Sequence, residues 1–156
     1  MWQSAGKKEH LATADTELKM CDELGFNTVR LWMNFDVYYK EPDEFMDTLE
    51  QYVSLSAKHH QSVMLVITYE EDLPYGEIFV PKEPGVQKPL YTHFNRDYPA
   101  YVQHALKHEF RHYMEYPEIK PIFLEMVERT VKKYRNDKRI LAWNIINEPG
   151  IFSETA

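Results

Sequence analysis

The stretch "RILAWNIINEPG", residues 139–150, decides how this sequence is interpreted, because an apolar segment runs without a spacer into an amide, a carboxylate and a proline. Residues 140–146 have the continuous apolar character of a strand that is buried on both faces. Burial penalises the charged form of a carboxyl group and raises its pKa. Glu148 is therefore expected to hold a proton near neutral pH, as a general acid must.

Two other stretches have the same apolar character, residues 27–33 and 62–68. Together with residues 140–146 they predict three strands of a parallel sheet that is covered by helices. The segments between them have helical period, so the order is helix, strand, helix, strand, a long excursion, helix and strand. This alternation favours a parallel α/β arrangement.

The helices are predicted over residues 14–24, 43–60 and 118–137, where apolar residues recur at steps of three and four. Gly25 is placed to end the first helix in a left-handed conformation. Asp43, which follows a proline, is predicted to cap the start of the second. Prolines and glycines keep residues 72–95 out of regular structure, and an extra helix is expected over 97–116.

The composition indicates one globular domain of 156 residues, with 44% hydrophobic residues to form a core. A formal net charge of −7 argues against nucleic acid and anionic membrane surfaces as partners. Cys21 is the only cysteine, so no intrachain disulfide is possible. Localisation is not fixed by the sequence, and secretion or a periplasmic location is compatible with it.

The segment "KYRNDKRILAWNIINEPG" resembles the fourth-strand signature of the clan A glycoside hydrolases, the (β/α)₈ or TIM barrels that include cellulases and mannanases. "ELGFNTVRLWM" resembles the second strand of that clan, "KHHQSVMLVIT" the third, and "MWQ" the end of the first. The resemblance implies an α/β fold, a partial TIM barrel from the end of strand 1 through strand 4, with the long loop and extra helix inserted between strand 3 and helix 3.

The resemblance also implies roles for individual residues. Glu148 is expected to be the general acid/base, and Asn147 to bind the sugar hydroxyl next to the anomeric carbon. Arg30 is expected to orient the nucleophilic carboxylate; the alternative is a structural cation paired with some other carboxylate. Three weaker candidates for sugar binding lie at strand ends: Trp2, Asn34 and Glu70. Trp32 and Trp143 are interpreted as core or barrel-wall residues rather than as platforms for a sugar.

Retaining hydrolysis of a β-linked glycoside needs two carboxylates roughly 5–5.5 Å apart. The resemblance places the second on a later strand, so residues 1–156 are expected to be the N-terminal half of one catalytic domain, carrying the acid/base without the nucleophile. Such a half is expected to be inactive alone, and its partners to be an oligo- or polysaccharide and the missing C-terminal half. No cofactor and no metal is expected.

Two other functions remain open. A carbohydrate-binding barrel without catalysis would retain the same sugar contacts. "HEFRH", residues 108–112, matches the helix motif of zinc peptidases. Its histidines, with His104, fall on the face opposite the apolar residues of their predicted helix, so a solvated histidine face is the preferred interpretation.

Overall fold

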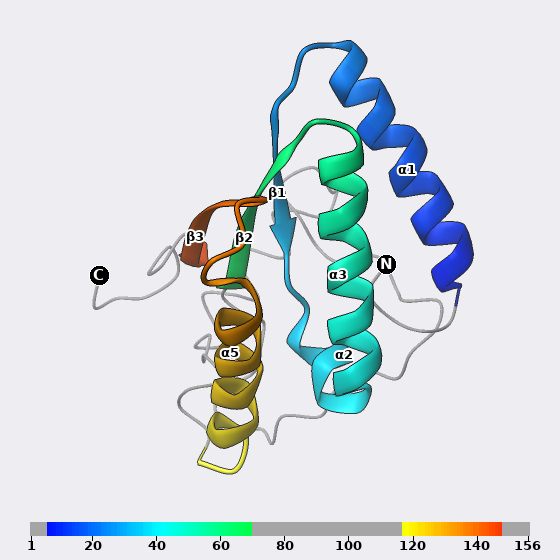
Figure 1. Ribbon diagram of the computed structural model, residues 1–156. Coiled ribbons are helices and arrows are strands. Elements are labelled where there is room, and N and C mark those ends of the chain that lie inside the picture. The colour runs from blue at the N-terminus through cyan, green and yellow to red at the C-terminus, as the bar shows by residue number, and fades with distance from the viewer. Residues whose placement is uncertain (1–5, 70–116, 148–156) are drawn as a thin grey trace, which may run out of the picture.

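The computed structural model describes residues 6–69 and 117–147, in which a parallel sheet is the central element (Figure 1). Its strands are β1 (Thr28–Trp32), β2 (Ser62–Tyr69) and β3 (Ile140–Asn147), in the order β1-β2-β3. All three match the predicted apolar stretches, and both pairings are parallel. The sequence prediction of three parallel strands is therefore confirmed.

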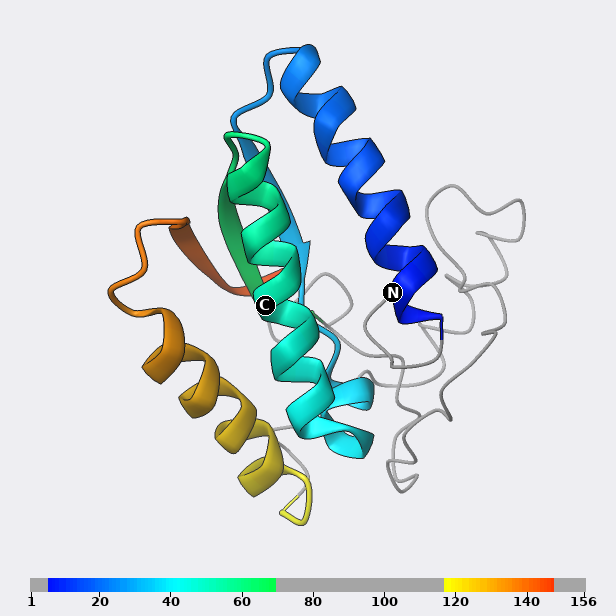
Figure 2. The same cartoon turned by 45° about the vertical axis from the view of Figure 1, so that its right-hand side comes forward.

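The helices of the described residues are α1 (Lys7–Glu23), α2 (Phe35–Lys40), α3 (Pro42–Lys58) and α5 (Lys120–Tyr134). The three long helices lie on one side of the sheet (Figures 1 and 2). No helix within the described residues covers the other side, and none of the described helices is long and apolar enough to cross a membrane. The sheet therefore has one face that the described helices cover and a second face that no described helix covers, although Val66 and Thr68 of β2 are buried on that second face.

The expected partial TIM barrel is wrong. The described residues form a small α/β structure with a three-stranded parallel sheet, and a four-strand partial barrel is not indicated. The expected additional strand rested on "MWQ", a stretch too short to show the period or the burial of a strand. That stretch lies outside the described residues, as do the expected inserted loop and extra helix between residues 72 and 116.

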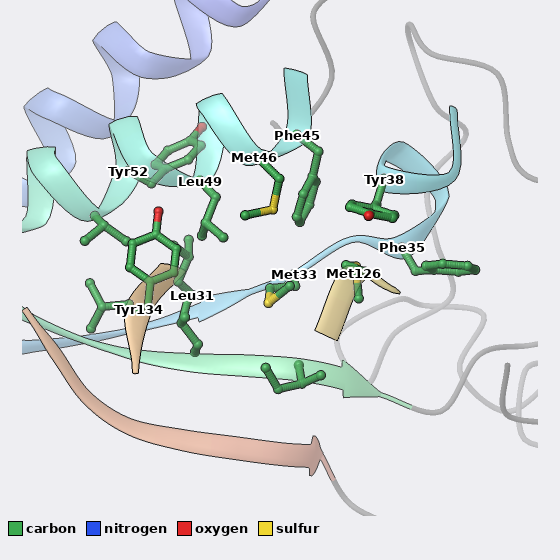
Figure 3. Close-up of a cluster of buried hydrophobic side chains, with 14 of the residues drawn as sticks. Leu31, Met33, Phe35, Tyr38, Phe45, Met46, Leu49, Tyr52, Met126 and Tyr134 are labelled. Carbon is green, nitrogen blue, oxygen red and sulfur yellow. The ribbon is translucent and has the colours of Figure 1, made fainter. Parts of the chain in front are cut away.

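The core fills the space between the sheet and its helices (Figure 3). Leu31, Val63, Leu65 and Ile67 of β1 and β2 are buried, and they alternate along the strands as residues on one face must. They pack in one cluster with apolar residues of the helices, among them Phe45, Leu49, Val53, Phe123, Met126 and Tyr134. The period-3.6 pattern of α3 and α5 thus places their apolar sides on the sheet.

The end of α1 and the start of α3 test two predictions that were made from local sequence. Gly25 has φ +85°, its N–H donates to the Asp22 carbonyl, and the Phe26 N–H donates to the Cys21 carbonyl. This is the Schellman arrangement that a glycine after a helix favours. The prediction for Asp43 is wrong, because α3 begins at Pro42, where a proline at the first position needs no N–H partner.

Strand β3 is less buried than its apolar sequence suggests. Leu141 is 59% exposed and Ile145 is 68% exposed, whereas Trp143 between them packs against the core. Within the described residues β3 pairs only with β2, so it lies at the edge of the sheet. Continuous apolar character therefore did not mean burial on both faces here.

Candidate functional site

The candidate site lies where the parallel strands end. Tyr69 and Asn147 are paired across β2 and β3, at the carboxyl ends of both strands. The polar residue Asn34 follows β1 at the same edge. In α/β proteins with a parallel sheet, ligands bind at this edge because loops of different origin converge on it.

Arg30 and Asn147, two predicted site residues 117 positions apart, are in direct contact. Arg30 Nη2 donates a hydrogen bond to Asn147 Oδ1 at 3.0 Å and a second to Asn144 Oδ1 at 2.8 Å. A guanidinium can only donate, so both amides must turn their oxygen atoms toward it. The Asn147 Nδ2 group then points away from Arg30, and it makes no hydrogen bond with the described residues.

Asn144 was not predicted from the sequence, although it holds Arg30 as closely as Asn147 does. Its Nδ2 group donates to the Ile146 carbonyl at 2.9 Å, which fixes the orientation of the amide. The signal in the sequence was a single amide within the apolar run "ILAWNII". A polar side chain inside a buried strand needs hydrogen-bond partners, so Asn144 could have been predicted to bind another polar group.

Trp32 completes this group of side chains, which we call the Arg30 cluster: Arg30, Trp32, Asn144 and Asn147. The Arg30 Cζ atom lies 5.0 Å from the centroid of a Trp32 ring, within cation–π distance. Trp32 is 37% exposed, so its interpretation as a core residue is wrong. Leu31 and Met33 take the buried positions, and strand alternation directs Arg30 and Trp32 toward the face that no described helix covers.

Asn34 has a structural task at the end of β1. Its Oδ1 atom accepts a hydrogen bond from the Val37 N–H at 2.9 Å and thereby caps α2. Helix α2, only six residues long, was not predicted, because a single turn and a half shows no clear apolar period. The capping asparagine, with Asp36 in the first turn and Lys40 in the last, was the available signal.

Glu148, Trp2 and Glu70 lie outside the described residues, as does the motif at residues 108–112 with His104. In the sequence, Glu70 follows Tyr69 and Glu148 follows Asn147, so each comes directly after one of the two paired strand ends. In residues 6–69 and 117–147, no group of histidine, cysteine, aspartate and glutamate side chains is arranged to hold a metal ion.

The described histidines at the end of α3 serve the helix packing. His59 is buried, and its Nε2 atom lies 2.7 Å from Asp15 Oδ1 on α1. Lys58 Nζ lies 2.7 Å from the same oxygen. Hydrogen bonds from Lys58 and His59 lower the pKa of the Asp15 carboxyl. These pairs hold α1 against α3 on the helix-covered side, away from the Arg30 cluster.

No family model, curated protein or solved structure matches this chain.

Proposed function

We propose that this chain carries the sugar-binding and proton-donating residues of a retaining glycoside hydrolase that cleaves β-linked bonds. The observation that carries the proposal is the hydrogen bond from Arg30 to Asn147, because it joins two residues that the family resemblance assigns to a sugar site. The proposal assigns Glu148, the next residue in the chain, as the general acid/base.

Each group has a definite task in this proposal. Arg30 holds the Asn147 amide so that Nδ2 is left to donate to a sugar hydroxyl. Trp32 offers part of an indole face beside these donors. Glu148 protonates the departing glycosidic oxygen and then removes a proton from the water that attacks the glycosyl intermediate. The proposal also requires a second carboxylate to form that intermediate, and no residue of this chain is assigned to that task.

The test has two readouts, because this chain alone is expected to bind sugar without cleaving it. Asn147→Ala should weaken β-linked oligosaccharide binding by the chain, measured by calorimetry. In the polypeptide that includes the second carboxylate, Glu148→Gln should slow hydrolysis of unactivated glycosides by about 10²- to 10⁴-fold. Glycosides with very acidic leaving groups should be affected less in the first step, because they depart without a proton.

Glu128→Gln is the matched control, since Glu128 lies on the exposed side of α5 and its side chain is 62% exposed. It should change neither readout. Equal turnover of both substrate classes by parent and Glu148→Gln would remove Glu148 as the acid. Oligosaccharide binding without hydrolysis in the completed polypeptide would favour the other candidate that the Arg30 cluster supports, a carbohydrate-binding protein without catalysis.

A further inference from the structure

Arg30 differs from the arginines that this fold uses to join its elements. Arg129 Nη2 lies 2.6 Å from Asp43 Oδ1, and Arg139 Nη1 lies 2.8 Å from Glu50 Oε1. Arg30 makes no ion pair with any described residue, and its hydrogen-bond partners are the neutral amides of Asn144 and Asn147. The positive charge of Arg30 is thus held in place without being neutralised by the described part of the chain.

The geometry leaves part of the guanidinium available. Nη2 makes both bonds to the amide oxygens, which uses its two N–H groups, and the N–H groups of Nε and Nη1 have no partner among the described residues. Amide oxygens on one side and the Trp32 ring 5.0 Å away limit how the group can turn. A cation that is oriented in advance loses little freedom when an anion binds.

A carboxylate is the anion that suits this position. Three N–H donors on a fixed positive group make charge-assisted hydrogen bonds to carboxylate oxygens, which are shorter and stronger than bonds to a hydroxyl. We propose that Arg30 receives a carboxylate group of the saccharide, so that the ligand is an acidic sugar, a β-linked uronate, rather than a neutral one. This inference rests on the proposed function and specifies its substrate class.

The experiment compares one ligand with and without its charge. The probes are a β-1,4-linked mannuronate trimer and the same trimer with its carboxyl groups converted to methyl esters, which keeps the sugar rings and linkages. Calorimetry on the full 156-residue chain should show the acid binding about tenfold or more tightly than the ester, the factor expected for a charge-assisted hydrogen bond. The preference should decrease as salt is added.

Two variants test whether Arg30 is the cause. Arg30→Gln removes the charge. Asn144→Asp places a carboxylate against the Arg30 guanidinium, and it also loses the hydrogen bond from Asn144 Nδ2 to the Ile146 carbonyl. Both should abolish the preference for the acid. Arg135→Gln is the matched control. Arg135 is exposed at the end of α5 and its side chain makes no ion pair with the described residues, so the same loss of charge there should leave the preference intact.

The outcomes separate the inference from the proposed function. Equal affinity for acid and ester would overturn the inference, as expected if Arg30 is reserved for a carboxylate of the protein itself, while sugar binding as such would stand. Failure to bind either trimer would also overturn the inference, whereas the proposed function is contradicted only if neutral β-linked oligosaccharides fail to bind as well. If Arg30→Gln does not fold by circular dichroism, Asn144→Asp carries the test, and a full acid preference in that variant would overturn the inference.

Discussion

Arg139 donates a hydrogen bond from Nη1 to Glu50 Oε1 at 2.8 Å, and this contact joins the residue before β3 to the middle of α3. Tyr134 O–H, at the end of α5, donates to the other oxygen of Glu50 at 3.0 Å. Burial alone would raise the pKa of the Glu50 carboxyl, but hydrogen bonds from Arg139, Tyr134 and Ser54 hold that pKa below its ordinary value. One carboxylate therefore connects three elements at the end of the sheet away from the candidate site.

Replacing Glu50 should destabilise the fold without affecting the Arg30 cluster. Glu50→Gln removes the charge that Arg139 and Tyr134 bind, and we expect the free energy of unfolding to fall by about 1–2 kcal/mol, because the side chain is half-buried and its bonds involve a charge. Urea denaturation measures this. Glu9→Gln, on α1, is the control. Glu9 is exposed and its side chain has no partner in residues 6–69 and 117–147, so an equal loss there would show that the contacts of Glu50 contribute nothing.

Stability should also fall in acid. A hydrogen bond from Arg139 lowers the pKa of Asp137, and one from Lys7 lowers the pKa of Asp47, in the same direction as for Glu50. A carboxyl whose folded-state pKa is depressed stabilises the fold above its ordinary value, here 3.8 for aspartate and 4.5 for glutamate, and this stabilisation is lost as pH falls through the folded-state pKa.

The urea midpoint should therefore be nearly constant from pH 7 to pH 5 and decrease steadily below pH 4.5. Denaturation curves at fixed ionic strength across that range measure it. Glu50→Gln should flatten part of the decrease, since one of the three groups no longer titrates. A midpoint that rises on acidification would contradict the assignment of these carboxylates as ionised partners.

The apolar pattern predicted the strands of this chain because the hydropathy of a strand depends only on the residues of that strand. The contact between Arg30 and Asn144 could not be predicted in the same way. It depends on the register of β1, β2 and β3, which places Arg30 opposite Met64 and Met64 opposite Ala142. No local pattern contains that register, because it is set by how the connecting helices pack.

The short helix α2 and the exposure of Trp32 could not be predicted from the sequence either. Helix α2 is fixed by the cap at Asn34 rather than by a long apolar period. Trp32 lies in an apolar run and yet is 37% exposed, because the described helices cover only the other face of the sheet. Hydropathy indicates that a strand has a buried face, but it does not indicate how much of each face is covered by other elements.

Gly25 should be sensitive to substitution for a reason of backbone conformation alone. Its φ of +85° disfavours residues with a Cβ atom, and no atom lies within 4 Å of the place where a Cβ would be. We expect Gly25→Ala to lower the free energy of unfolding by about 1–2 kcal/mol. Gly25→Asn should cost less, because asparagine tolerates the left-handed region better. Equal losses for the two variants in thermal unfolding would contradict backbone conformation as the cause.

Leu65 and Leu141 provide a matched test of which positions hold the sheet to its helices. Leu65, in the central strand β2, is 0% exposed and belongs to the core cluster, whereas Leu141 on β3 is 59% exposed. Leu65→Ala should reduce the free energy of unfolding by about 2–5 kcal/mol, because a buried methyl-rich side chain leaves a cavity. Leu141→Ala removes the same atoms and should cost about 0.5 kcal/mol or less. Urea denaturation of both variants measures the difference, and a large loss for Leu141→Ala would mean that another part of the chain covers β3 in solution.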